Sequence, residues 1–254
     1  MKNSLLFVTF IASMAILYGN TFSLVSKNQD MKSIKFVSST IEFNEKDGYT
    51  RLTNPELGST VEDGMPELPT YSTFFHMEPG KAYNVEFEVI SSHTVDNIEI
   101  FPYQGEPEIG TVRPFLKNVD FYTSKSKFPE SNITVSEPMI MRDIEVGQIT
   151  FIPFEYNAHE KQLTIYDDVN ISVIESVERE DVANFPLKRS YLFEPFYEDL
   201  ILDYEPLSTR EEYQPATIMY VCGGASLSHP FVQDLIEWRR LQGYIVYAVS
   251  TSET

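Results

Sequence analysis

Short runs of alternating apolar and polar residues cover the chain from residue 36 to residue 174 and predict β-strands. In the run Val85 to Val89, apolar side chains alternate with two glutamates, the pattern of a strand with one buried face and one acidic outer face. Turn-forming residues separate such runs at intervals of about eight to twelve residues, and no run has helical periodicity. The pattern predicts a mainly β protein with an antiparallel β-sandwich or barrel-like domain over residues 36–174.

Two acidic turn signals divide this β-rich stretch. Asp47-Gly48 lies between the runs Phe36 to Phe43 and Tyr49 to Leu52, and it supplies the positive φ angles of a tight hairpin turn. Asp167-Asp168 precedes the run Val169 to Ile174 and predicts a second turn.

The last part of the chain has a different pattern, which predicts a strand, a helix and a second strand. Thr217 to Cys222 and Tyr244 to Val249 are apolar runs without a polar face, as in strands buried on both sides of a parallel sheet. Between them, Ser228 or His229 can cap a helix that has Pro230 at its first position and ends before Gly243. One βαβ unit cannot cover two such strands, so we expect residues 214–254 to begin a longer α/β domain.

Residues 175–213 break the alternating pattern and predict a connector between the two domains. The connector is charged at both ends, and the apolar residues between Phe193 and Ile201 have a spacing that predicts a short helix. Exposed polar connectors that contain basic residues are preferred sites of proteolysis.

The N-terminus has the layout of a secretory signal peptide. Lys2 precedes an apolar run from Leu5 to Tyr18, and small residues follow, which predicts a leader over residues 1–23 that is cleaved near Ser23. The alternative, a membrane anchor, is disfavoured because the run is shorter than the roughly 20 residues that span a bilayer. We therefore expect an exported protein, secreted or at the cell surface, with a loose polar segment at residues 24–35.

Charge and cysteine content narrow the possible partners. The chain has 19 basic and 38 acidic residues, a formal net charge of −19, which opposes binding to nucleic acid or anionic lipid. Cys222 is its only cysteine, so no disulfide can form within the chain and stability must come from the core.

Cys222 and the glycines after it invite two catalytic interpretations. Cys222 and His229 could form a nucleophile and base, but they flank a turn that nothing in the sequence obliges to bring them together, which favours a buried structural thiol. Gly223-Gly224 lacks the full G-x-G-x-x-G pattern, so it predicts a strand-to-helix turn rather than a nucleotide site.

Metal sites are weakly supported as well. Asp167, Asp168 and Asn170 could offer oxygens to calcium, but no glycine-centred loop with a closing glutamate accompanies them, and a solvated turn is favoured. The histidines lack metal-ligand spacing; they include His76, His93 and His159. We therefore predict no catalytic residue, no cofactor and no metal ligand in this chain.

Two parts of the sequence resemble the precursors of gingipain-type cysteine peptidases. In the β-rich domain the matching text is Gly64 to Pro69, Ser136 to Asp143 and Ile152 to Asn157. In the last segment it is Leu235 to Tyr244, which resembles the first helix of that family's caspase-like catalytic domain. The similarity covers most of residues 36–254.

The resemblance implies the front part of a secreted cysteine endopeptidase made as a zymogen. The β-rich domain would be the propeptide, acting as inhibitor and folding aid, and its partner would be the protein's own downstream catalytic domain, whose substrates are proteins. The family's catalytic histidine and cysteine lie at the ends of later strands, so no residue here receives either role. This chain alone is therefore expected to be inactive.

The resemblance also directs attention to basic residues, because maturation in this family often follows one. We expect Arg210 to be the main processing site and Arg189, after Lys188, to be a second. Four residues could mimic substrate in the active site and stay unranked: Arg113, Lys125, Lys127 and Arg142.

A second hypothesis is a secreted, non-enzymatic β-sandwich that serves as a binding or inhibitor module. Aromatic side chains could line a surface for a partner protein or a polysaccharide. The candidates are Phe115, Phe121, Tyr122 and Phe128. The coding sequence after Thr254 would separate the two hypotheses, since only the peptidase requires a continuing α/β pattern.

Overall fold

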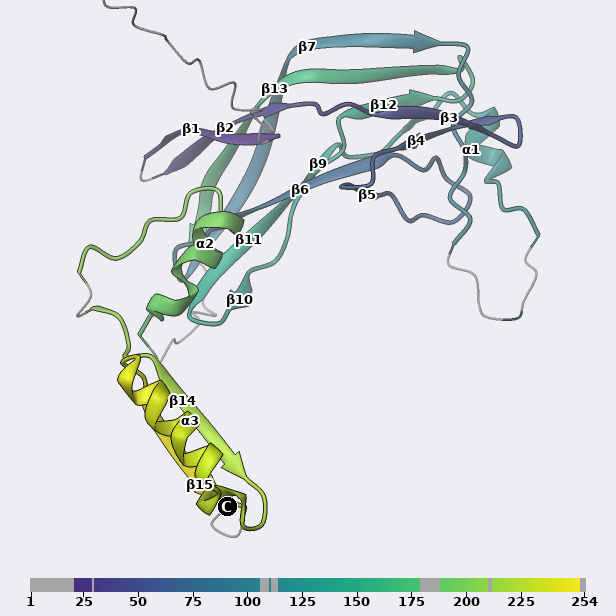
Figure 1. The fold of residues 1–254 in the computed structure, drawn as a ribbon. Coiled ribbons are helices and arrows are strands. Elements are labelled where there is room, and N and C mark those ends of the chain that lie inside the picture. Colours follow the sequence, from purple (N-terminus) through teal and green to yellow (C-terminus); the bar gives the residue numbers. More distant parts are fainter. Residues whose placement is uncertain are drawn as a thin grey trace, which may run out of the picture.

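Two open β-sheets packed face to face form the larger part of the structure (Figure 1). The computed structural model describes residues 21–251, apart from Gln29 and residues 106–109, 111–113, 179–187 and 210–211. Neither of the two large sheets closes on itself over these residues, so the expectation of an antiparallel β-sandwich is confirmed and the barrel-like form is not.

The first sheet has six strands in the order β1-β2-β13-β12-β8, with β7 also paired to β13. Their bounds are β1 (Phe22–Lys27), β2 (Met31–Val37), β7 (Lys81–Asp96), β8 (Lys127–Phe128), β12 (Phe154–Asn157) and β13 (Gln162–Glu178). The second sheet has the order β10-β11-β6-β5, with β9 paired to β11. Its strands are β5 (Gly58–Ser59), β6 (Pro69–His76), β9 (Ile133–Val135), β10 (Met139–Met141) and β11 (Ile144–Phe151).

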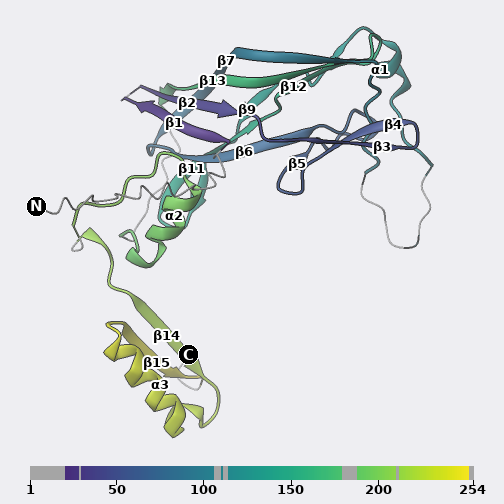
Figure 2. The same cartoon turned by 45° about the horizontal axis from the view of Figure 1, so that its top comes forward.

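The other elements are short or stand apart from these sheets. They are the hairpin of β3 (Glu42–Lys46) and β4 (Tyr49–Thr53), helix α1 (Val119–Thr123), the 3-10 turn η1 (Tyr191–Phe193), helix α2 (Glu194–Leu200), and the final β14 (Thr217–Cys222), η3 (Ser226–Ser228), α3 (Pro230–Leu241) and β15 (Ile245–Ser250). Figure 2 shows that this final group lies away from the sheets. No helix in the described part of the chain is long and apolar enough to span a membrane.

Aromatic residues join the two sheets in one core. The ring of Phe36 on β2 is fully buried, 5.0 Å from the ring of Tyr71 on β6 and 4.8 Å from that of Phe151 on β11, measured between centroids. Both contacts are edge-to-face, the arrangement that aromatic pairs prefer. Alternation along β2 and β13 supplies the rest of this layer, since Ile34 pairs with Ile171 and both are buried.

The N-terminal strands correct the expectation of a loose segment at residues 24–35. β1 and β2 form an antiparallel pair in which Phe22 lies opposite Phe36, and β2 is hydrogen-bonded to β13 on its other side. The side chain of Phe22 is only 6% exposed. This pairing makes residues 22–37 part of the sandwich.

The two acidic turn signals have different outcomes. Asp47 and Gly48 have φ angles of 55° and 82° and join β3 to β4, so that hairpin turn is confirmed. Asp167-Asp168 does not turn the chain, and that prediction is wrong: β13 continues through it, with a shift of register against β7 that marks a bulge. Polar residues such as aspartate occur both at bulges and at turns, because each leaves backbone groups unpaired. The sequence alone therefore did not distinguish the two.

The helix α1 was not expected from the sequence. It has five residues, too few for a helical repeat to show, and the side chain of Asn118 caps it by accepting a hydrogen bond from the Phe121 amide. Helical periodicity therefore says nothing about an element of one turn.

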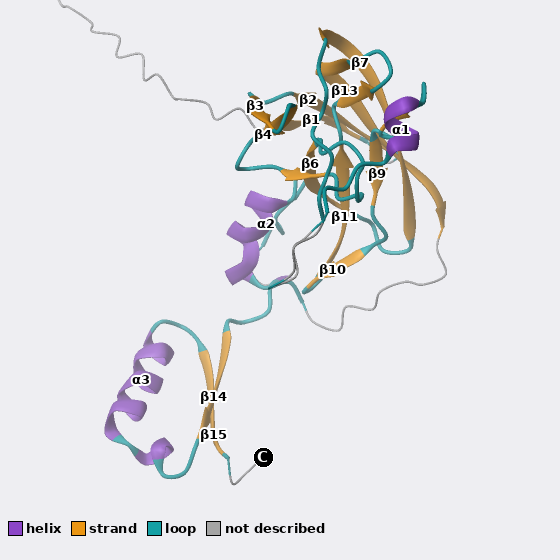
Figure 3. Cartoon of the chain, turned by 90° about the vertical axis from the view of Figure 1, so that its right-hand side faces the viewer, coloured by secondary structure: helices purple, strands orange, loops and turns teal. Residues whose placement is uncertain are grey.

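The final segment has the βαβ form that its sequence predicts. β14 and β15 are parallel, and α3 begins at Pro230 with His229 as its N-cap. The expectation that both strands are buried on both faces is not met within this chain, because Met219 and Val221 are 64% and 58% exposed. Figure 3 shows α3 on one side of the two strands.

Candidate functional site

The connector is docked on the sandwich along the second sheet. In its described part, Tyr197 of α2 and Ile201 are buried against Ile144 and Val146 of β11. The Leu202 amide donates a hydrogen bond to the Phe74 carbonyl at 2.9 Å, which adds a short stretch of backbone pairing beside β6. The expected short helix is confirmed by α2. The connector was expected to be exposed, whereas α2 packs against the second sheet.

Asp143, in the tight turn between β10 and β11, is the first polar anchor of the connector. Its carboxylate is buried, and its Oδ2 accepts a hydrogen bond from the Ser190 amide at 2.9 Å. The Tyr197 hydroxyl donates to its Oδ1. Burial, reinforced by this bond, raises the pKa of Tyr197 above its usual range, which keeps the hydroxyl protonated as a donor.

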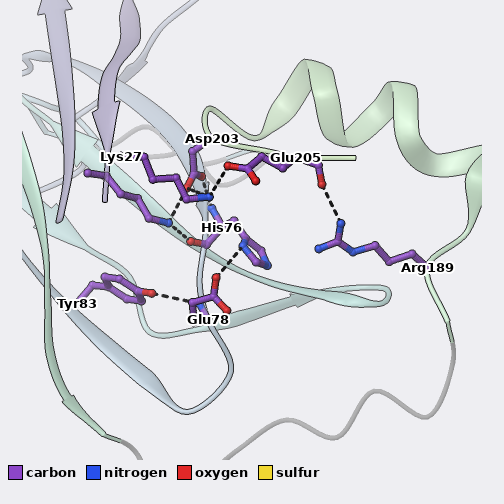
Figure 4. A network of polar contacts seen from close by, with 8 residues as sticks. Lys27, His76, Glu78, Tyr83, Arg189, Asp203 and Glu205 are labelled. Atoms are coloured by element: carbon purple, nitrogen blue, oxygen red, sulfur yellow. Dashed lines mark hydrogen bonds and ion pairs between the residues drawn. The ribbon is translucent and has the colours of Figure 1, made fainter. Parts of the chain in front are cut away.

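The second anchor is Asp203, whose side chain is 1% exposed and contacts Lys32 of β2 and His76 of β6. Figure 4 shows Asp203 beside His76 and Lys27. Lys32 Nζ lies 2.6 Å from its Oδ2, and the His76 amide donates to its Oδ1 at 2.7 Å. Lys27 lies 3.7 Å from the same carboxylate and 3.1 Å from Glu205. A buried carboxylate is tolerated only when it is paired and hydrogen-bonded in this way.

Burial lowers the pKa values of two basic groups near Asp203, Lys32 and His76. It lowers the pKa of Lys32, and the nearby Asp203 carboxylate opposes that shift. Burial also lowers the pKa of His76, whose Nδ1 lies 3.8 Å from Glu78. His76 is therefore favoured as a neutral side chain beside the charged Lys32.

Arg142 connects the first anchor to the end of the connector. It has a φ of 59°, which places it at the tip of the β10–β11 turn. Its guanidinium pairs with Asp143 at 3.1 Å and lies 4.5 Å from the centroid of the Phe193 ring. The oxygen and nitrogen of the Gln214 side-chain amide fit their neighbours when interchanged. The oxygen then accepts a hydrogen bond from the Arg142 guanidinium at 2.6 Å.

Of the two expected processing residues, the structure describes Arg189 but not Arg210. Arg210 lies outside the described residues, although its neighbours Thr209 and Glu212 are exposed. Arg189 is held: its Nη1 donates to the Glu205 carbonyl at 2.9 Å, as Figure 4 shows.

Ser23, where leader cleavage was expected, lies inside β1. Of the expected leader, residues 1–23, residues 1–20 lie outside the described part.

The four substrate-mimic candidates are not gathered in one place. Arg113 lies outside the described residues. Lys127 pairs with Glu155 at 2.6 Å, and Arg142 is held in the docking interface. Lys125 is exposed at the bend that follows α1.

The other candidate residues have structural surroundings. Cys222 is buried at the end of β14, while His229 caps α3 through its Nδ1, which accepts from the Phe231 amide at 3.3 Å. The metal candidate Asp168 pairs with Lys35 at 2.9 Å, and Asp167 pairs with His93 at 2.8 Å. No group of three potential metal-ligating side chains occurs among the residues that the structure describes.

Three of the four aromatic residues suggested as a binding surface lie in the core instead. Phe121, Tyr122 and Phe128 are buried. Phe115 is half-exposed, and its ring stacks on that of Tyr49 at 5.6 Å between centroids. The observation that motivated a separate binding module is thereby weakened.

The docking anchors could not be recognised from the sequence. Lys32 and Asp203 are far apart in the chain, and the residues around each give no indication that the two side chains will meet. Asp143 belongs to the text Met141-Arg142-Asp143 that carried the resemblance, but nothing local indicates that Tyr197 will meet it. Only the tertiary fold brings these groups together.

Comparison with known proteins links this arrangement to one family. Residues 19–207 match the sequence profile of the family described as Propeptide_C25. Gingipain R1 of Porphyromonas gingivalis is 26% identical over 269 residues, which cover 96% of this chain and 26% of that protein. Gingipain R2 of Porphyromonas gingivalis is 24% identical over 270 residues, covering 95% of this chain and 36% of that protein. The chain thus spans 26–36% of the length of these relatives.

Solved structures share the fold. One, described as a complex of Porphyromonas gingivalis RgpB pro- and mature domains, contains a chain 26% identical to this one with a TM-score of 0.60; the alignment covers 73% of this chain and 98% of that chain. A second, described as structural insight into zymogenic latency of gingipain K from Porphyromonas gingivalis, is 18% identical with a TM-score of 0.52, covering 61% and 92%. The second likeness concerns the fold alone.

Proposed function

Because this chain belongs to the Propeptide_C25 family and includes a gingipain-type propeptide region, we propose that its β-rich part, residues 21–178, inhibits a gingipain-like cysteine endopeptidase and assists its folding. The observation that carries the proposal is the shared fold with a chain of a complex of pro- and mature domains. The peptidase activity, its protein substrates and export of the precursor belong to the same proposal, since the chain spans only part of its relatives.

The βαβ segment supports the assignment of residues 214–254 as the start of the catalytic domain. Met219, Val221 and Tyr247 are exposed on the strands, and Phe231 and Leu241 are exposed on α3. Large apolar side chains in one small unit need covering by further elements. The remaining strands and helices of an α/β domain would supply that cover and, with it, the catalytic histidine and cysteine.

Maturation would then cut the connector after Arg210. The residues on both sides of it in the described chain are exposed, as an endopeptidase requires. Export would involve a leader that is removed before Thr21, since Phe22 belongs to the core.

Inhibition by this chain can be measured directly. The complete precursor is expected to hydrolyse peptide substrates only after maturation, and the purified chain added to the mature enzyme is expected to reduce that hydrolysis. An unrelated β-sandwich of similar net charge serves as the control for nonspecific acidic binding. A precursor as active as the mature enzyme, together with no inhibition by the added chain, would leave the non-enzymatic binding module as the better hypothesis.

A further inference from the structure

We propose that the bond between Arg189 and Ser190 is a latent processing site, which Asp143 keeps closed while the connector is docked. The inference concerns the regulation of maturation within the proposed function. It depends only on the docking geometry, so it can fail or hold independently of which enzyme the propeptide inhibits.

The sequence at this bond suits an endopeptidase that cleaves after basic residues. Lys188-Arg189 is followed by the small residue Ser190. Hydrolysis would add water across the bond, with the hydroxyl going to the Arg189 carbonyl carbon and a proton to the Ser190 nitrogen. The sequence would therefore be recognised by such an endopeptidase, and cleavage depends on whether the bond between Arg189 and Ser190 is accessible to it.

Each group that a peptidase must engage at this bond already has a partner. The backbone N–H of Ser190 donates a hydrogen bond to Asp143 Oδ2 at 2.9 Å, and the Arg189 carbonyl accepts one from the backbone N–H of Gln214 at 2.8 Å. The Arg189 guanidinium donates to the Glu205 carbonyl at 2.9 Å. An endopeptidase needs the Arg189 carbonyl in its oxyanion hole and the Arg189 side chain in its specificity pocket. The docked connector and cleavage at this bond therefore exclude each other.

Burial reinforces the protection on the Ser190 side. Ser190 is 4% exposed, and the Asp143 carboxylate that holds it also accepts from the Tyr197 hydroxyl. Cleavage must then pass through a locally open state, and its rate follows the population of that state. A change that weakens the Asp143 anchor should raise the rate at this bond and leave exposed bonds unaffected.

The experiment is limited proteolysis of the full chain with trypsin, followed by mass spectrometry of the peptide that begins at Ser190. All proteins carry Arg210→Gln, so that a cut at residue 210 cannot release Gln214. The internal reference is the bond between Lys125 and Ser126, two exposed residues. We expect cleavage at Ser190 to be slower than at the reference bond, and Asp143→Asn to accelerate it by about tenfold or more, the effect of weakening a hydrogen bond to a charged group.

Matched variants test whether the effect is local. Asp168→Asn changes a carboxylate that pairs with Lys35 in the first sheet and should leave the Ser190 cut unchanged. Tyr197→Phe removes one hydrogen bond from Asp143 and should accelerate the cut, which keeps the test decisive if Asp143→Asn does not fold. The proposal is overturned if the unaltered chain is cut at Ser190 as fast as at the reference bond, or if neither anchor variant changes the rate.

Discussion

Asp143 and Asp203 are buried carboxylates that help to hold the connector on the sandwich. Each carboxylate is almost completely buried and receives at least one backbone amide as well as a charged or hydroxyl partner. Charged hydrogen bonds of this kind are stronger than neutral ones, and they are costly to leave half-made. Removal of either carboxylate's partners should therefore weaken the docking, in addition to the apolar contacts around α2.

Removal of Lys32 should expose that dependence. Lys32→Met leaves the Asp203 carboxylate buried with only the His76 amide and the more distant Lys27, so we expect the free energy of unfolding to fall by about 3 kcal/mol. Denaturation with urea, monitored by tyrosine fluorescence, measures the change.

Lys35→Met is the matched control, because Lys35 pairs with Asp168 in a partly exposed site where ion pairs contribute about 1 kcal/mol or less. Equal losses for the two variants would contradict the importance of the buried pair. Combining Lys32→Met with Asp203→Leu should recover part of the loss, because no uncompensated charge then remains.

Among the secondary-structure elements, β1 has a consequence for the leader. The Thr21 carbonyl accepts a hydrogen bond from the Val37 amide at 2.9 Å, and the Phe22 ring packs on Phe36 at 5.2 Å. Cleavage after Ser23 would remove Phe22 from the core, a loss of about 3 kcal/mol or more. We therefore predict that the exported protein begins before Phe22, with Gly19 as a suitable small residue next to the cut.

Sequencing of the exported protein's N-terminus tests this prediction. A start at or before Thr21 agrees with it. A start at Leu24, in a protein as stable as one that retains Phe22, would show that β1 does not need its first residue.

Elements set by neighbouring residues were predictable, and those set by distant ones were not. Asp47-Gly48 and Pro230 act through their own backbone angles, so the hairpin and the start of α3 followed from the sequence. β1 and β2 were not predicted because lysines and serines make up three of six and three of seven of their residues, and only β2 has buried residues in alternation. The docked connector depends on the contact of Tyr197 with Asp143, 54 residues away, and no local pattern encodes such a contact.

At the scale of the whole molecule, processing should separate two parts that were folded in one chain. Arg210→Ala in the complete protein is expected to leave the precursor uncut at this junction, because the basic residue after which we propose cleavage is lost. Mass spectrometry of the mature form's N-terminus gives the result.

Arg189→Ala is the comparison, since its bond is closed in the docked state and its loss should not alter the first cut. A mature N-terminus that is unchanged by Arg210→Ala would remove Arg210 as the processing site.

The pairing of Ser190 with Gln214 gives the connector one further property. A parallel bridge joins these residues, so the chain between them, which is docked on the sandwich through α2 and Asp203, returns to nearly its starting point before β14 begins. Because its two ends are joined, the length of the stretch between them does not set the position of the α/β segment. Insertions or deletions around the exposed residues Ser208 and Thr209 would change the length of this stretch at little entropic cost and leave the relative position of the sandwich and the α/β segment unchanged.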